Sequence, residues 1–260
     1  MNRAEPVIAG KRNLAIMSIS NDEIFPFINF KGENSRAIGH EHGFLLADRI
    51  DQAIKIYQNR FAHQPNYNQK LIESICEDYR RGIQRFSSNY IDELDAIAIA
   101  SKQDPLWIVA LNCRLEILNH LAFGIQNECT VLYDQTKCQL AENWDWLESF
   151  ERLAFINEIS SKGVLQMTEP GVLGKVGLNR FGIGVTINFV DPPFQSQNHS
   201  YIPLHISLRA VLDEAKSFQE AIDIFKQNGP GFGGHVLLGS YFDIFHQVFF
   251  FSLFILFFSG

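Results

Sequence analysis

The chain has 260 residues, of which 46% are hydrophobic and 20% are charged, and its formal net charge is −7. This composition is typical of a globular protein with a substantial core, and the acidic balance argues against general nucleic-acid binding. Its four cysteines are few and irregularly spaced, so neither a disulfide framework nor a Cys-x-x-Cys metal pair is indicated. A reducing, cytoplasmic location is therefore expected, and the N-terminus lacks the apolar run of a signal peptide.

Apolar residues at helical spacing dominate the first half of the chain. Ser35 is the expected N-cap of the first helix, and Asp104 followed by Pro105 is a strong start signal for the last one. Helices are predicted at residues 35–61, 69–86, 90–102 and 106–120.

The pattern changes near Gly124 to short segments of alternating polarity. A hairpin is predicted from the strands 129–133 and 138–144, with "DQTK" as its turn. Further strands are expected at 152–159, 163–169, 173–179 and 182–189, helices at 203–215 and 217–229, and a strand at 235–240. Helices followed by a run of strands and then a helix pair predict an α+β fold with helix-covered sheets.

Several motifs resemble the acyl-coenzyme A:6-aminopenicillanic acid acyltransferase family, which corresponds to peptidase family C45. They are "ECT" at 128–130, "ENWDW" at 142–146, "EPGVLGKVGLNRFGIGVTIN" at 169–188 and "PLHISLRAVLDEAKSFQEAI" at 203–222. Upstream, "HEHG" at 40–43 and "ALNCRLEIL" at 110–118 are similar to the family's helical pro-segment. The resemblance implies the four-layer αββα sandwich of N-terminal nucleophile hydrolases.

Within that resemblance Cys129 is the nucleophile, exposed when the bond between Glu128 and Cys129 is cut. A cysteine at a chain N-terminus carries its own base, because its α-amine has a pKa near 7.7–8.0 in model compounds. That amine can take the thiol proton and return it to a leaving amine. In the uncut chain the same thiol can attack the preceding carbonyl, provided that the turn before it is held ready for attack.

The resemblance also assigns roles to three neighbours of the nucleophile. Asp145 matches the aspartate that orients the nucleophile's amine. Asn188 matches a position that helps to place the scissile group in related choloylglycine-type hydrolases. Thr130, next to the nucleophile, is expected to assist self-cleavage at Glu128, Cys129 and Thr130. The plainer interpretations remain open: a buried structural cysteine, a surface carboxylate and an ordinary strand residue.

Two features depart from the family pattern. Glu128 stands where the family often has glycine, and a side chain there narrows the available turn geometries, so slow self-cleavage is expected. The resemblance also stops at about Gly239, before the asparagine of the oxyanion hole, a kind of donor whose removal typically costs about 10²–10³ in turnover. We therefore expect a helical pro-segment or small subunit at 1–128, a partial hydrolase core at 129–240 and an aberrant Phe-rich tail at 241–260.

The leading functional hypothesis is an autoprocessed cysteine amidohydrolase or N-acyltransferase that acts on C–N amide bonds through a thioester at Cys129. Its substrate would be a small acyl amide or an acyl-coenzyme A-like molecule. The alternatives are a hydrolase of small N-acyl amines, such as β-alanyl amines, and a truncated inactive precursor.

Further partners are not expected beyond the chain's own small and large fragments after cleavage. No cofactor is expected. No metal is expected either, because His40 and His42 are two positions apart and point to opposite sides of a helix. The apolar run at 248–258 is shorter than the roughly 20 residues needed to span a bilayer, so membrane insertion is not the favoured interpretation.

Overall fold

We describe the protein from a computed structural model, in which residues 24–121, 129–134, 136, 139–189, 202–228, 234–240 and 244–249 are placed. Six helices occupy the first half of this part of the chain, as the apolar spacing predicts. They are α1 (Ser35–Leu45), α2 (Ala47–Ala62), α3 (Gln69–Phe86), α4 (Ser88–Ser101), α5 (Pro105–Asn112) and α6 (Arg114–His120).

The helix boundaries correct three predictions. Asn34, not Ser35, caps α1: its backbone is extended and its side chain accepts a hydrogen bond from the N–H of Ala37, so Ser35 is already helical. The expected helix at 35–61 is interrupted at Leu46, and the expected helix at 106–120 is interrupted at Cys113. The predicted start at Asp104 is confirmed, because its side chain accepts from the N–H of Leu106.

Helix α1 packs closely on α4 because two of its glycines face that helix. A Cβ added at Gly39 would collide with the backbone carbonyl of Glu93, and one added at Gly43 would collide with that of Ile97. The two backbones can therefore approach more closely than larger side chains would allow. The helices bury one continuous apolar core with the sheet, in which Ile50, Ile97 and many other side chains are fully buried.

A seven-stranded sheet forms the centre of the molecule, with the strand order β1-β4-β5-β6-β7-β8-β9. Every neighbouring pair is antiparallel except β1 and β4, which are parallel. Its strands are β1 (Phe27–Phe30), β4 (Phe155–Ile159), β5 (Val164–Thr168), β6 (Val176–Asn179), β7 (Gly184–Phe189), β8 (Gly234–Gly239) and β9 (Ile244–Phe249). Strands β1 and β9 have no counterpart among the predicted elements, and β9 lies in the segment expected to be an aberrant tail, whereas β4 to β8 match predicted strands.

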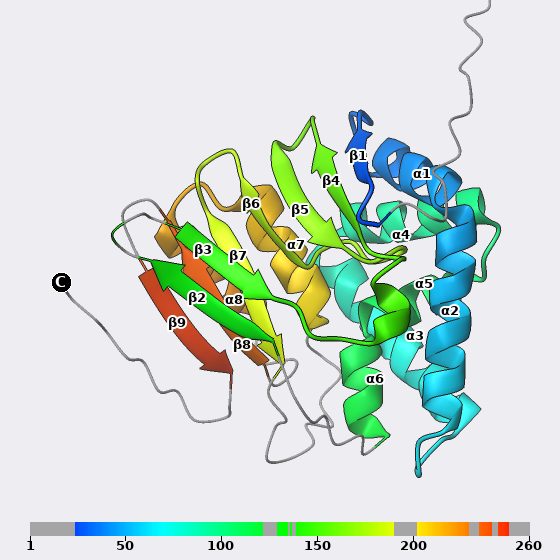
Figure 1. Ribbon diagram of the computed structural model, residues 1–260. Coiled ribbons are helices and arrows are strands. Elements are labelled where there is room, and N and C mark those ends of the chain that lie inside the picture. The colour runs from blue at the N-terminus through cyan, green and yellow to red at the C-terminus, as the bar shows by residue number, and fades with distance from the viewer. Residues whose placement is uncertain are drawn as a thin grey trace, which may run out of the picture.

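Different elements cover the two faces of the seven-stranded sheet (Figure 1). Helices α7 (Leu204–Glu214) and α8 (Phe218–Asn228) lie against one face, while the two-stranded sheet of β2 (Thr130–Asp134) and β3 (Gln139–Asn143) lies over β7 on the other. Helices α1 to α6 gather at the end of the sheet formed by β1 and β4. A single turn of 3₁₀ helix (Glu148–Phe150) follows β3. The predicted α+β class is confirmed.

None of the helices in the described ranges is both long enough and apolar enough to cross a membrane. Strand β9 adds residues 244–249 to the edge of the sheet by pairing with β8. The remainder of the Phe-rich segment and the first 23 residues lie outside the described residues.

Candidate active site

The register of the hairpin determines what surrounds Cys129. Thr130 is paired with Asn143, so Cys129 lies one step beyond the ladder, beside the segment that follows β3. Its thiol is half-buried, and Sγ lies 4.0 Å from the backbone carbonyl oxygen of Asp145. Cys129, Cys76 and Cys113 are free thiols. The structure thus brings the predicted nucleophile next to the predicted orienting residue.

The side chains of the other predicted site residues have different surroundings. The Asp145 carboxylate is exposed and accepts a hydrogen bond of 2.9 Å from Asn143 Nδ2. Thr130 is exposed at the start of β2. Asn188 is half-buried in β7, and its Oδ1 has no hydrogen-bond partner among the described residues. Glu128 lies outside the described residues, so the geometry of the predicted cleavage bond stays a prediction.

Behind Cys129 lies a buried set of charged side chains that the sequence interpretation did not single out. Glu169 accepts hydrogen bonds from Arg114 Nη2 at 2.6 Å and from Lys175 Nζ at 2.7 Å. The hydroxyl of Tyr57 accepts from Arg114 Nε at 2.7 Å and from Trp146 Nε1 at 3.0 Å. We call Arg114, Glu169, Lys175 and Tyr57 the thiol cluster. It contains two cations and one carboxylate.

A small cavity of about 30 Å³ joins Cys129 to this cluster. Its wall combines the thiol, aromatic rings and titratable groups from six segments of the chain. The lining residues are Arg114, Leu115, Cys129, Glu142, Trp144, Trp146, Glu169, Lys175, Ile187 and His205. Asn188 is not among these residues, although its neighbour Ile187 is.

Burial sets the protonation of the groups around the thiol. It raises the pKa of the Cys129 thiol above its usual range; Glu142 adds to this rise and Lys175 opposes it. Burial also raises the pKa of Glu142 to about 7 and lowers that of Lys175 to about 8. Glu169 behaves differently: burial alone would raise its pKa, but Arg114 and Lys175 together lower it to about 2. The ammonium of Lys175 is therefore the nearby charge that favours the thiolate.

Lys175 is held in place on two sides. Its Nζ donates to Glu169 and lies 3.4 Å from the centroid of the Trp144 ring, which is a cation–π contact. Trp144 follows β3 directly, so the same short segment that flanks Cys129 also covers the lysine. Glu142 is held by the sheet instead: its Oε2 accepts from the backbone N–H of Ile187 at 3.1 Å.

The loop between β5 and β6 carries Glu169 and Lys175, and long-range hydrogen bonds clamp it. Asn112 donates to the carbonyl of Gly171 at 2.8 Å and accepts from the N–H of Leu173 at 2.9 Å. His42 Nε2 accepts from the N–H of Gly171 at 2.9 Å. Such clamping fixes both charged side chains without a regular secondary structure in the loop.

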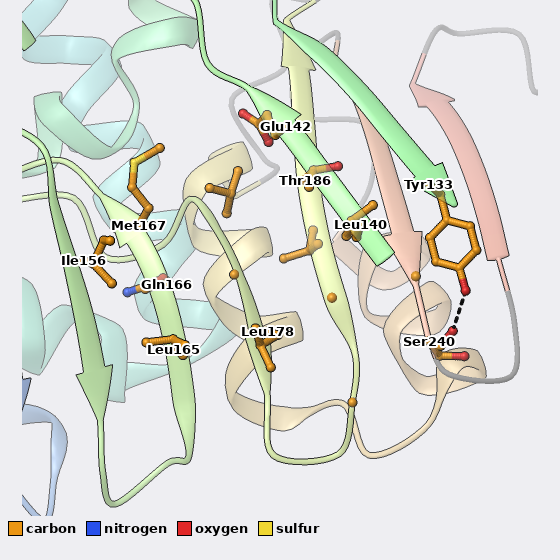
Figure 2. A pocket seen from close by; sticks show the side chains of 16 residues that line it. Tyr133, Leu140, Glu142, Ile156, Leu165, Gln166, Met167, Leu178, Thr186 and Ser240 are labelled. Atoms are coloured by element: carbon orange, nitrogen blue, oxygen red, sulfur yellow. Dashed lines mark hydrogen bonds between the residues drawn. The ribbon is translucent and has the colours of Figure 1, made fainter. Parts of the chain in front are cut away.

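A second and larger cavity, of about 510 Å³, lies on the sheet face beside the hairpin (Figure 2). Its walls are mainly apolar and include Leu140, Leu165, Met167 and Leu178. At one end the hydroxyl of Tyr133 donates to the carbonyl of Ser240 at 3.1 Å. Glu142 lines both cavities and so links the apolar surface to the thiol.

Two comparisons with known proteins find similarity in this part of the chain. The family model of acyl-coenzyme A:6-aminopenicillanic acid acyl-transferase matches residues 133–242, a region that begins four residues after Cys129 and contains Glu169, Lys175 and Asn188. The chain is also 24% identical over 211 residues to the acyl-coenzyme A:6-aminopenicillanic-acid-acyltransferase 40 kDa form of Emericella nidulans. The chain is thus similar to this acyl-transferase family.

The match to the Emericella nidulans protein covers 78% of this chain and 57% of that relative's length, so the chain spans little more than half of the curated relative. The family implies the N-terminal nucleophile hydrolase fold, with which the mixed helices and multi-stranded sheet are consistent. Among the residues that the structure places, no group of three or more His, Cys, Asp or Glu side chains could hold a metal ion.

Proposed function

We propose that this chain catalyses acyl transfer at C–N amide bonds through a thioester on Cys129. One observation carries the proposal: a half-buried thiol opens into a cavity that also contains the buried ammonium of Lys175. A cation near a thiol favours the thiolate, which is the nucleophilic form. Similarity to the acyl-transferase family supports the same reaction class.

In the first half of the proposed reaction, Cys129 Sγ attacks the carbonyl carbon of the acyl donor. The thiol proton passes to the α-amine of Cys129 and then to the leaving amine as the C–N bond breaks. Lys175 stabilises the thiolate before attack, and Asp145 keeps its proposed role of orienting the α-amine. Water or an amine then takes the acyl group from the thioester.

An apolar acyl group fits the arrangement of the two cavities. The carbonyl carbon would lie at Cys129, while the rest of the group could follow the wall at Glu142 into the cavity of about 510 Å³. Apolar contacts there would contribute binding free energy that the small thiol cavity cannot supply. The relative's printed name mentions acyl-coenzyme A and 6-aminopenicillanic acid, so acyl thioesters are also donors to test; with them the C–S bond breaks and the proton goes to the leaving thiolate instead of an amine.

The α-amine becomes available only if the bond between Glu128 and Cys129 is cut, and we propose that the chain cuts it itself. Intact-protein mass spectrometry provides a direct test. Two fragments, ending at Glu128 and starting at Cys129, are expected from the wild-type chain. The Cys129→Ala variant should remain a single chain of 29.7 kDa. Cleavage of that variant at the same bond would exclude Cys129 as the self-cleaving residue.

Acyl transfer is tested separately with an activated acyl p-nitrophenyl ester. We expect a burst of p-nitrophenol and an acyl group on the peptide that begins with Cys129. The matched control is Cys138→Ala, which removes a cysteine that has no part in the proposed reaction and should leave the burst unchanged. A Cys129→Ala protein that retained the burst would contradict the proposal.

A further inference from the structure

His205 is a buried histidine of the thiol cavity that has no role in the proposed reaction so far. It is the second residue of α7 and is 1% exposed. Its Nδ1 lies 2.8 Å from the carbonyl oxygen of Gly174, a contact that requires Nδ1 to carry the proton and to donate it. The lone pair of the neutral ring is therefore on Nε2.

That Nε2 atom is buried, yet it has no hydrogen-bond partner within the described part of the chain. A buried acceptor without a partner costs free energy unless a small molecule satisfies it. The hydrogen bond to Gly174 fixes one edge of the ring and directs the opposite edge away from that carbonyl. His205 lines the cavity that contains Cys129. Because Nδ1 is bound to Gly174, Nε2 is the ring nitrogen that remains for a molecule in this cavity.

The cavity has a suitable size for such a molecule. A buried water needs a cavity volume of roughly 10–15 Å³. The cavity of about 30 Å³ can therefore hold about two waters or one small polar group. Arg114 is already engaged, because it binds Glu169, Tyr57 and the carbonyl of Leu111, whereas Oε1 of Glu142 has no hydrogen-bond partner among the described residues. Nε2 thus offers an acceptor to a group that carries an O–H or N–H.

We propose that His205 Nε2 positions the nucleophile that removes the acyl group from Cys129, by accepting a hydrogen bond from a water or a primary amine. This inference rests on the proposed function, and it assigns a residue to the deacylation step, in which the acyl group leaves Cys129. The nucleophile's oxygen or nitrogen forms a bond to the acyl carbon, and the bond between that carbon and Sγ breaks. The nucleophile's proton passes through the α-amine of Cys129 to the leaving Sγ.

His205 acts here as a positioning residue. Burial and the nearby guanidinium of Arg114 lower the pKa of His205 well below its usual value, so the ring stays neutral and takes up no proton. Its contribution is orientation: misplacing a reacting group by about 1 Å can cost about 100-fold in rate.

The experiment separates acylation from deacylation in two matched variants. His205→Asn keeps an amide N–H near the position of Nδ1 and loses the Nε2 acceptor, whereas His205→Gln keeps an acceptor near Nε2 and loses the bond to Gly174. With an acyl p-nitrophenyl ester, His205→Asn should show the wild-type burst and a steady-state rate about 10- to 100-fold lower. Acylated Cys129 should accumulate in its mass spectrum.

His205→Gln should deacylate at nearly the wild-type rate, which also keeps the test decisive if the asparagine variant does not fold. Added glycinamide distinguishes the two nucleophiles: the ratio of acyl amide to acid shows whether amine, water or both use His205. Wild-type turnover in His205→Asn, or equally slow turnover in both variants, would overturn this inference alone. A wild-type protein that never forms acyl-Cys129 would overturn the proposed function with it.

Discussion

Two clusters of charged side chains are buried in the part of the chain that the structure describes, and they differ in charge balance. In the first, which we call the core cluster, Arg209 binds both oxygens of Glu93 at 2.9 and 3.0 Å and also binds Asp213 at 2.8 Å. Lys162 completes it with a contact of 2.6 Å to Asp213. Two cations therefore face two carboxylates. The thiol cluster has two cations for one carboxylate, and these three charged side chains line the cavity of Cys129.

The difference shows how similar ion pairs serve different purposes. Burial alone would lower the pKa of Arg209. The carboxylates of Asp213 and Glu93 nevertheless raise it, because together they compensate the positive charge of Arg209. The pKa of Lys175 falls to about 8 because burial outweighs its one shared carboxylate. A balanced cluster joins helices, whereas an unbalanced one leaves positive charge next to the thiol. Four predictions test this comparison.

The largest effect is expected from breaking the core cluster. Arg209→Met would leave Glu93 and Asp213 buried without their main partner, and we expect the free energy of unfolding to fall by about 3–5 kcal/mol. Urea denaturation measures the change. Arg36→Met, which removes an exposed ion pair with Asp92, is the control and should leave stability unchanged. Equal effects in the two variants would mean that the core cluster is not structural.

In the thiol cluster, Glu169 should make stability depend on acid pH. Its pKa falls from 4.5 to about 2 on folding, so its contribution is complete above pH 4.5 and is lost as the pH drops toward 2. The shift corresponds to about 3 kcal/mol. Urea denaturation between pH 2 and 7 should show this acid limb in the wild type and a flatter profile in Glu169→Gln. An unchanged profile would contradict the buried pairing.

The surplus cation should affect thiol reactivity more than stability. Lys175→Met removes the charge that favours the Cys129 thiolate, so the thiol pKa should rise and alkylation at neutral pH should slow by about tenfold per pKa unit. Iodoacetamide labelling, followed on the peptide containing Cys129, measures the rate. Lys162→Met, in the core cluster, should leave it unchanged. Faster labelling in Lys175→Met would show that the lysine shields the thiol instead.

The smallest stability effect is expected at Asp145, whose exposed side chain is held by Asn143. Asp145→Ala should change the free energy of unfolding by less than about 1 kcal/mol, as is usual for exposed positions. If the carboxylate orients the α-amine, acylation of Cys129 should nevertheless slow markedly. A variant with wild-type burst kinetics would remove Asp145 from the site.

Local signals in the sequence predicted much of the fold. Asp104 and Pro105 marked a helix start that the structure confirms, and alternating polarity located the β2–β3 hairpin and strands β4 to β8. The cap at Asn34 and the interruption at Leu46 were missed, because neighbouring polar residues can each cap a helix and only backbone geometry selects one. Strand β1 was missed because four residues carry too little periodicity, and its partner β4 lies more than 120 positions away in the chain.

The sequence by itself determined the candidate nucleophile, its hairpin and the acyl-transferase resemblance, since each depends on residues that are close in the chain. Only the tertiary structure brought Lys175, Glu169 and His205 to Cys129, from a loop and a helix 40 or more positions away. The physical reason is burial. A Lys, a Glu or a His in a sequence has an ordinary pKa and many possible partners, and packing selects the partners and shifts the pKa. In this protein the partners are selected by hydrogen bonds to the loop between β5 and β6. Gly171 is bound by Asn112 and His42, and Gly174 is bound by His205.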